Sequence, residues 1–210
     1  MAGWLEERHL MIEETIMKKV LMTEKCRGKT ISLDDYTHIR AYHACRIENV
    51  EAYKKNGIVP FTKQSAIEDA VKKLSDERLG EDEVRKQAEE TWKECNIHKV
   101  WLDLEQSELL GEDCHYLIYG SEFLNAVAAQ LWCRDKLKAI GKPTIVVCDV
   151  PLNMVSDTWT NGLEQAVKKG EASICSIAVN RVSPEDIIEF IFPTGYVKDP
   201  YLGYANYKLG

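Results

Sequence analysis

Apolar positions that recur at helical spacing predict three helical regions. Residues 4–25 alternate apolar and charged side chains with this spacing, which indicates an amphipathic helix ahead of the main fold. Residues 64–96 are highly charged and predict two surface helices separated at Gly80. The clearest helical pattern covers 121–141, where Ser121 stands in the N-cap position. Helices therefore account for much of the first two thirds of the chain.

Short apolar runs rich in β-branched residues predict strands between these helices. Residues 37–45 alternate along a strand, and the short helix that follows ends at Gly57, a usual residue at a helix C-terminus. In 183–192, a Ser-Pro pair predicts one helical turn before a final strand. The tail over 193–210 is expected to be irregular. Further strands are predicted over 98–104, 114–120, 142–152 and 171–182.

Several of these strands follow one another without a clear helix between them. This order favours an α+β fold with short packed sheets over a doubly wound parallel sheet. The chain divides into an N-terminal amphipathic helical segment over 1–30 and a single domain over 31–210, with a helical insert at about 64–96. The N-terminal helix is expected either to pack on this domain or to bind a partner protein.

Charge and hydropathy narrow the function classes. The formal net charge is −7, from 27 basic and 34 acidic residues, which argues against broad, non-specific adhesion to nucleic acid but leaves a local basic groove open. No apolar run approaches the roughly 18–20 residues that cross a bilayer, so no membrane partner is expected. The charged N-terminus does not resemble a secretory signal. We therefore expect a cytoplasmic protein.

The seven cysteines are scattered, odd in number and form no CxxC pair. A disulfide framework or zinc site requires clustered cysteines, so the sequence predicts reduced thiols and no metal. Most of the cysteines fall inside apolar runs, where a free cysteine behaves as a small hydrophobic residue.

The stretch "YHACR" concentrates chemistry near the end of the first predicted strand. His43 is either a ligand-gripping histidine or a core histidine bonded to a backbone carbonyl. Cys45 allows a cysteine-dependent hydrolase, with a distant histidine as the base. His43 itself suits that role poorly, because side chains two positions apart on a strand diverge.

Two later stretches add polar groups at the ends of predicted elements. In "YLIYGSEFL", Ser121 opens a helix, so its hydroxyl and the free backbone N–H groups either hold an anionic ligand or form an ordinary helix cap. Glu171 stands directly before the predicted strand over 171–182. A carboxylate there is either a charge-stabilising acid or a solvated loop residue.

Taken together and in this order, these stretches resemble the ADP-ribosyltransferase fold family, whose members are related to diphtheria toxin and poly(ADP-ribose) polymerase. "YHACRIENVEAYKKNGI" resembles the opening of the family, and "VSPEDIIEF" resembles its common ending; the similarity covers roughly 37–192. The resemblance implies Glu171, Tyr119 and Ser121 as catalytic residues, and His43, Ala44, Arg46 and Tyr116 as residues that bind NAD.

The resemblance also implies the reaction. NAD serves as substrate, no metal is required, and a single ADP-ribose passes to a macromolecular acceptor, either protein or nucleic acid, as in toxins and phage-defence effectors. A carboxylate stabilises the oxocarbenium-like transition state. Two departures matter: Ala44 replaces a usual glycine, which favours a catalytically inactive binding module, and Arg46 leaves open an arrangement in which arginine grips the ribose. A hydrolase that uses Cys45 is the third reading.

In the family, the loop before the catalytic glutamate presents the acceptor. Here that loop contains Trp159, which either anchors the acceptor or packs beneath the loop.

Overall fold

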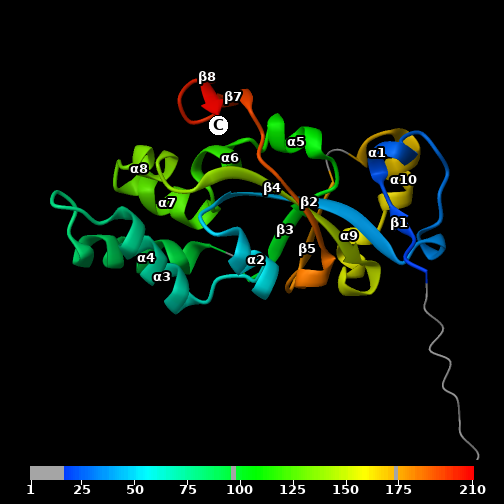
Figure 1. Ribbon diagram of the computed structural model, residues 1–210, viewed down its shortest axis with the longest axis horizontal. Coiled ribbons are helices and arrows are strands. Elements are labelled where there is room, and N and C mark those ends of the chain that lie inside the picture. Colours follow the sequence, from blue (N-terminus) through cyan, green and yellow to red (C-terminus); the bar gives the residue numbers. More distant parts are fainter. Residues whose placement is uncertain (1–16, 96–97, 173–174) are drawn as a thin grey trace, which may run out of the picture.

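The computed structural model describes residues 17–95, 98–172 and 175–210, and it shows an α+β fold (Figure 1). A twisted, mostly antiparallel sheet has the order β5-β3-β2-β4-β6, with β1 beside β2. The sheet is built from β1 (Val20–Leu21), β2 (His38–Ile47), β3 (Val100–Asp103), β4 (Lys142–Pro151), β5 (Ser176–Val179) and β6 (Ile187–Ile191).

Strand β2 is the spine of this sheet, and its two edges are paired very differently. Along one edge it pairs with β4 over ten residues, from His38 to Ile47. Along the other edge, parallel β1 covers only the beginning of the strand, and β3 is in register at Tyr42 with Asp103. Within the described residues, no β3 partner is registered beyond Tyr42. The second half of β2 therefore has one open edge.

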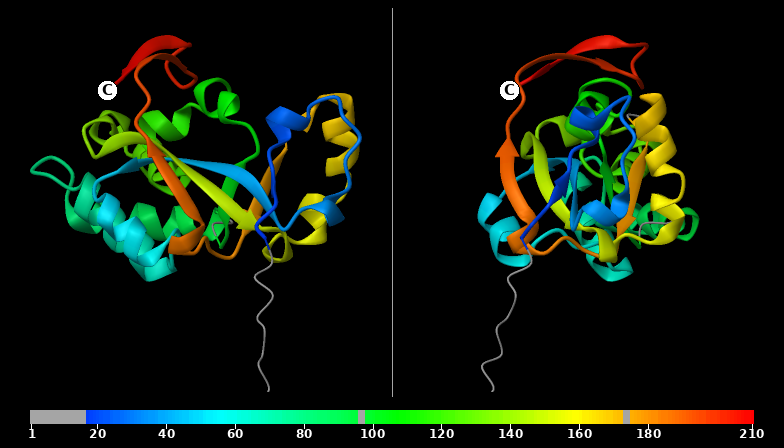
Figure 2. Two further views of the ribbon diagram at one scale, coloured as in Figure 1. Left: turned by 45° about the vertical axis from the view of Figure 1, so that its right-hand side comes forward. Right: turned by 90° about the vertical axis from the view of Figure 1, so that its right-hand side faces the viewer.

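Two hydrophobic cores lie on the two faces of the sheet, because alternate β2 side chains point in opposite directions. Tyr42 and Ala44 face a core built with α3, α4, α6, α7 and α8, whereas Ile39 and Cys45 face a core built with α2, α10 and β5. Figure 2 shows these helical groups on either side of the central strands. The helices are α1 (Thr23–Cys26), α2 (Val50–Asn56), α3 (Lys63–Leu74), α4 (Glu81–Glu94), α5 (Gln106–Leu110), α6 (His115–Tyr119), α7 (Glu122–Gln130), α8 (Arg134–Lys138), α9 (Asp157–Thr160) and α10 (Leu163–Lys169).

The C-terminal residues form a separate hairpin of β7 (Gly195–Asp199) and β8 (Ala205–Leu209), which lies over α6 in Figure 1. Asp199 is buried at the end of β7. It accepts a hydrogen bond from the hydroxyl of Tyr119 on α6, at 2.5 Å, and lies 3.6 Å from the ammonium of Lys138 on α8. This hairpin is thus fixed to the body of the domain by buried polar contacts.

Much of the predicted element order is confirmed. The strand that begins near residue 37, the helix that ends at Gly57 and the two helices separated at Gly80 are all present. The helix predicted over 121–141 is interrupted: α7 ends at Gln130, Trp132 adopts a positive φ of 55°, and α8 follows. Within the described ranges, no helix combines the length and apolarity that a bilayer crossing requires.

Three predictions of local structure are wrong. Over 17–22 the expected N-terminal helix is replaced by an extended segment that contains β1, because Val20 and Leu21 pair with β2; residues 1–16 lie outside the described residues. The strand expected over 114–120 is helix α6, which ends at Gly120 with a φ of 82°. The irregular tail over 193–210 is the hairpin of β7 and β8.

Candidate functional site

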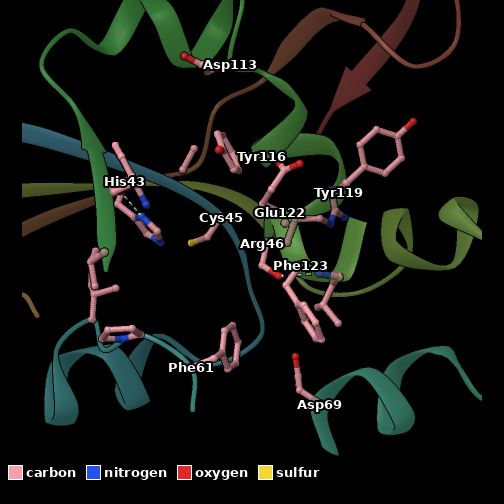
Figure 3. Close-up of a pocket in the computed structure, with 18 of the residues that line it drawn as sticks. His43, Cys45, Arg46, Phe61, Asp69, Asp113, Tyr116, Tyr119, Glu122 and Phe123 are labelled. Atoms are coloured by element: carbon pink, nitrogen blue, oxygen red, sulfur yellow. Dashed lines mark hydrogen bonds between the residues drawn. The ribbon is translucent and has the colours of Figure 1, made fainter. Parts of the chain in front are cut away.

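A cavity of about 370 Å³ opens where β2 and β3 diverge, and we call it the β2–β3 cleft. Its walls come from the second half of β2, from β3, from the residues around α2 and from α6 with the start of α7 (Figure 3). This volume lies within the usual range of small-molecule sites, about 300–1,000 Å³. Six of the seven residues that the sequence assigns to the site line it, namely His43, Ala44, Arg46, Tyr116, Tyr119 and Ser121.

His43 bridges the gap between the two strands at the base of the cleft. Its Nδ1 lies 3.0 Å from the carbonyl oxygen of Trp101 on β3 (Figure 3). A carbonyl only accepts hydrogen bonds, so Nδ1 carries the proton and Nε2 presents a lone pair. Burial lowers the pKa of His43, which keeps the ring neutral at neutral pH. His43 is therefore a hydrogen-bond acceptor that could bind a ligand hydroxyl.

The guanidinium of Arg46 is used by the protein itself. Arg46 has five N–H donors, and five contacts between 2.7 and 3.4 Å engage them. Arg46 consequently joins the end of β2 to α6, α8 and the C-terminal hairpin, and it contributes its side chain to the wall of the cleft rather than a free charge. Its partners are the carbonyl oxygens of Leu117, Lys138, Ile140 and Gly141 and the hydroxyl of Tyr207.

The two tyrosines of α6 have different surroundings. Tyr119 is 1% exposed, and its hydroxyl donates to Asp199 in the core, so burial and that bond raise its pKa. Tyr116 is only partly buried, and its ring lies 4.1 Å from that of His115. In Figure 3 the tip of Tyr119 turns away from His43 and Cys45, toward the outer part of the view. Tyr116 is therefore the tyrosine that is free to contact a ligand.

The start of α7 closes the neighbouring wall. The Ser121 hydroxyl accepts a hydrogen bond from the backbone N–H of Leu124 at 3.1 Å, which confirms Ser121 as the N-cap. The next residue, Glu122, lies 3.3 Å from Nε2 of His115 and lines the cleft. This wall thus carries one hydroxyl engaged in capping and one half-exposed carboxylate.

Glu171 lies apart from the other residues that the sequence assigns to the site. It is exposed and is absent from the described lining of the cleft. Gly170, with a φ of 79°, ends α10, and the N–H of Glu171 donates to the carbonyl of Ala166 at 2.8 Å. This pattern is a Schellman cap. The strand predicted to start at Glu171 begins instead at Ser176, and the backbone of Gly170 and Glu171 completes the end of α10.

One carboxylate of the cleft, that of Asp103, could not be identified from the sequence. Asp103 ends β3 opposite Tyr42, lines the cleft and is partly buried. Burial, reinforced by the negative charges of Asp113 and Glu108, raises the pKa of Asp103 to about 7. In the sequence, Asp103 is one polar residue in the run "VWLDL", and only the pairing of β3 with β2 identifies its position.

Cys45 also lines the cleft, but its thiol is not activated. The residue is 9% exposed, and burial raises its pKa to about 12. The Tyr53 hydroxyl lies 3.8 Å from the sulfur. Because the thiolate is the nucleophilic form, this environment argues against a hydrolase that uses Cys45. Among the described residues, no group of three or more His, Cys, Asp and Glu side chains gathers as a metal-binding cluster.

Two tryptophans lie beside the cleft. Trp101 on β3 is 43% exposed and lines the cavity, and Trp159 on α9 packs edge-to-face against it with ring centroids 4.8 Å apart. Trp159 is partly buried and also contacts the core on its side of the sheet. Trp159 therefore packs against the domain, next to the cleft. Its role as an anchor for the acceptor stays a prediction.

No protein-family model, curated protein or solved structure matches this chain. The evidence for function therefore lies in the residues that line the cleft.

Proposed function

We propose that this chain is an NAD-dependent mono-ADP-ribosyltransferase that modifies a macromolecular acceptor, and that NAD binds in the β2–β3 cleft. The observation that carries this proposal is the meeting of His43, Ala44, Tyr116 and Ser121 at one cavity. These residues belong to β2, α6 and the start of α7, and no local pattern brings them together. The ADP-ribosyltransferase resemblance assigns this same set to NAD binding and catalysis.

The chemistry of the cleft fits one half of NAD best. Asp69, Asp103, Asp113 and Glu122 line it, whereas the ammonium of Lys73 is paired with Glu48 and Asp69, at 3.0 Å each. An acidic, aromatic cavity favours the cationic nicotinamide ring, which can stack on Tyr116. The neutral Nε2 of His43 accepts a hydrogen bond from a ribose hydroxyl. The pyrophosphate then belongs at the rim, where Lys99 lies.

Two observations favour a second candidate, a catalytically inactive protein that binds a nucleotide in the same cleft. Glu171, the carboxylate that the resemblance makes catalytic, is outside the cavity. Ala44 replaces the glycine of the family, and its methyl group narrows the approach of a ligand to the β2 backbone. On this reading the cleft binds without cleaving the nicotinamide–ribose bond.

One experiment separates the two candidates. Purified protein is titrated with NAD by calorimetry, and free nicotinamide is measured over several hours with and without a cell lysate as the source of acceptor. The transferase reading expects saturable binding, nicotinamide release and an ADP-ribose mass shift on a lysate component. Binding without release supports the inactive module, and the absence of binding contradicts both. His43→Ala is the matched variant, because it removes the exposed lone pair and leaves β2 paired with β4.

A further inference from the structure

Asp103 occupies a distinctive place among the carboxylates of the cleft. It lies on the last residue of β3, at the point where β3 and β2 separate, and its Cα partner on β2 is Tyr42. Two residues earlier on β3, the backbone carbonyl of Trp101 accepts the hydrogen bond of His43 Nδ1. One short strand therefore supplies both the backbone that orients His43 and a carboxylate that lines the same cleft.

The other carboxylates of the cleft are engaged or lie farther out. Asp69 is 3.0 Å from the ammonium of Lys73, and Glu122 is 3.3 Å from His115. Figure 3 shows Asp113 at the top of the view, away from His43 and Cys45. The Asp103 carboxylate has no hydrogen bond or ion pair with any described residue, although the protein buries much of it. An unpaired, half-buried carboxylate inside a cavity is costly to keep unless it acts on something there.

We propose that Asp103 is the general base of this cleft and that it takes the proton from a protic nucleophile, an O–H or N–H group, as that nucleophile attacks the ribose. This inference rests on the proposed transferase function and replaces Glu171 as the carboxylate of the reaction.

The step balances as a substitution at the anomeric carbon. The bond between C1′ and the nicotinamide nitrogen breaks, and its electron pair neutralises the pyridinium ring, which leaves as nicotinamide. A new bond forms between C1′ and the oxygen or nitrogen of the acceptor, and the acceptor proton passes to the Asp103 carboxylate. Asp103 then releases this proton to water. A reaction that needs a base implies an acceptor group that carries a proton, such as an O–H or N–H group. A carboxylate side chain would need no base to attack.

The groups around Asp103 set the pH at which it can work. Glu108 on α5 and Asp113 before α6 raise its pKa, and His115 on α6 opposes them. Tyr42 faces it from β2, and burial raises the pKa of Tyr42 to about 12. A base whose pKa lies near the working pH is the most effective proton acceptor. The rate of nicotinamide release is therefore expected to rise with pH and to level off above about pH 7.

The test measures nicotinamide release from NAD, with water as the protic acceptor, between pH 5 and pH 9. Asp103→Asn is expected to lose about 100-fold or more in rate, while NAD affinity, followed by calorimetry, falls by about tenfold at most, because three other carboxylates still line the cleft. Glu108→Gln removes one negative neighbour and should move the midpoint of the wild-type pH profile to lower pH with little loss of plateau rate. Glu189→Gln, an exposed position on β6, serves as the matched control and should leave the profile unchanged.

The outcomes are distinct. Wild-type protein that neither binds NAD nor releases nicotinamide contradicts the proposed function itself. Active wild type with Asp103→Asn within threefold of its rate overturns the role of Asp103 alone, and so does a Glu108→Gln profile that coincides with the wild-type profile. The Glu108→Gln measurement decides the matter even if Asp103→Asn does not fold, because it leaves the Asp103 side chain in place.

Discussion

The two edges of strand β2 show how one strand can serve both as scaffold and as binding site. Toward β4, ten consecutive residues are paired in register, from His38 to Ile47. Toward β3, pairing is registered at Tyr42, and the cleft begins with the next residue. A strand held along the whole of one edge keeps its position while the other edge presents unpaired backbone and side chains to a ligand. The unpaired edge of β2 toward β3 is therefore part of the binding site.

The largest effect on stability is expected from removing the Arg46 hydrogen bonds that hold the end of β2. Arg46→Ala removes five hydrogen bonds and leaves several buried carbonyls without a partner, which should lower the free energy of unfolding by about 3–4 kcal/mol. Urea denaturation followed by tryptophan fluorescence measures it. Arg46→Lys should recover only part of this stability, because an ammonium cannot reproduce the planar fork. Wild-type stability in Arg46→Ala would show that the paired edge alone holds β2.

A smaller effect is expected at the open edge itself. His43→Ala should weaken NAD binding by about 10- to 100-fold, the loss of one good hydrogen bond together with ring contacts, while stability changes little. Calorimetric titration at pH 7.5 gives the affinity. Cys148→Ala, on the paired neighbour β4, is the contrasting variant: it should lower stability and leave affinity nearly unchanged, since Cys148 is fully buried and does not line the cleft. If Cys148→Ala weakened NAD binding and His43→Ala lowered only stability, the two edges of β2 would not differ in function as argued.

The pH dependence of the free energy of unfolding tests the carboxylate at the open edge of β2. The pKa of Asp103 is raised to about 7 in the folded protein, above the value of about 3.9 in an unfolded chain. The folded state holds this proton more tightly, so the associated stability is fully present below about pH 4 and is lost as the pH rises through 7. Asp103→Asn should therefore be more stable than wild type at pH 8, by about 1 kcal/mol after allowance for solvent screening. Equal urea midpoints at pH 8 would contradict the raised pKa.

The smallest effect is expected away from the cleft. Glu171→Gln changes an exposed side chain whose backbone, not its carboxylate, caps α10. Its stability should stay within about 0.5 kcal/mol of wild type, and nicotinamide release should be unchanged. A loss of release comparable with that of Asp103→Asn would restore Glu171 to the reaction and would require the segment around it to move toward the cleft.

The amphipathic periodicity and cap residues of the sequence were enough to predict α2, α3, α4 and the start of α7. They failed at α6, because "HYLIY" is a short apolar run that fits a strand or a helix equally well. Packing against β2 decides in favour of a helix there, and the Arg46 bond to the carbonyl of Leu117 is one of the contacts that hold it. The hairpin of β7 and β8 was missed for a related reason: its glycines and tyrosines carry little periodicity.

The site was predictable to the extent that it depends on short motifs along the chain. His43, Tyr116 and Ser121 were predicted from recognisable local patterns, and the structure places all three around one cavity. Asp103 was missed because its position depends on where β3 stops pairing with β2, a property of tertiary structure. Glu171 was expected to open a strand, whereas the left-handed Gly170 and the N–H of Glu171 end helix α10.

The C-terminal hairpin has a consequence for the order of events during synthesis. Residues 195–209 are synthesised after β2, β3 and α6, yet Asp199 and Tyr207 from that hairpin complete the surroundings of Tyr119 and Arg46. A nascent chain that already contains β2, β3 and α6 still lacks these partners. The cleft wall is therefore finished only once residues 195–209 have been made, and a chain that stops before Gly195 lacks the Asp199 and Tyr207 contacts that complete it.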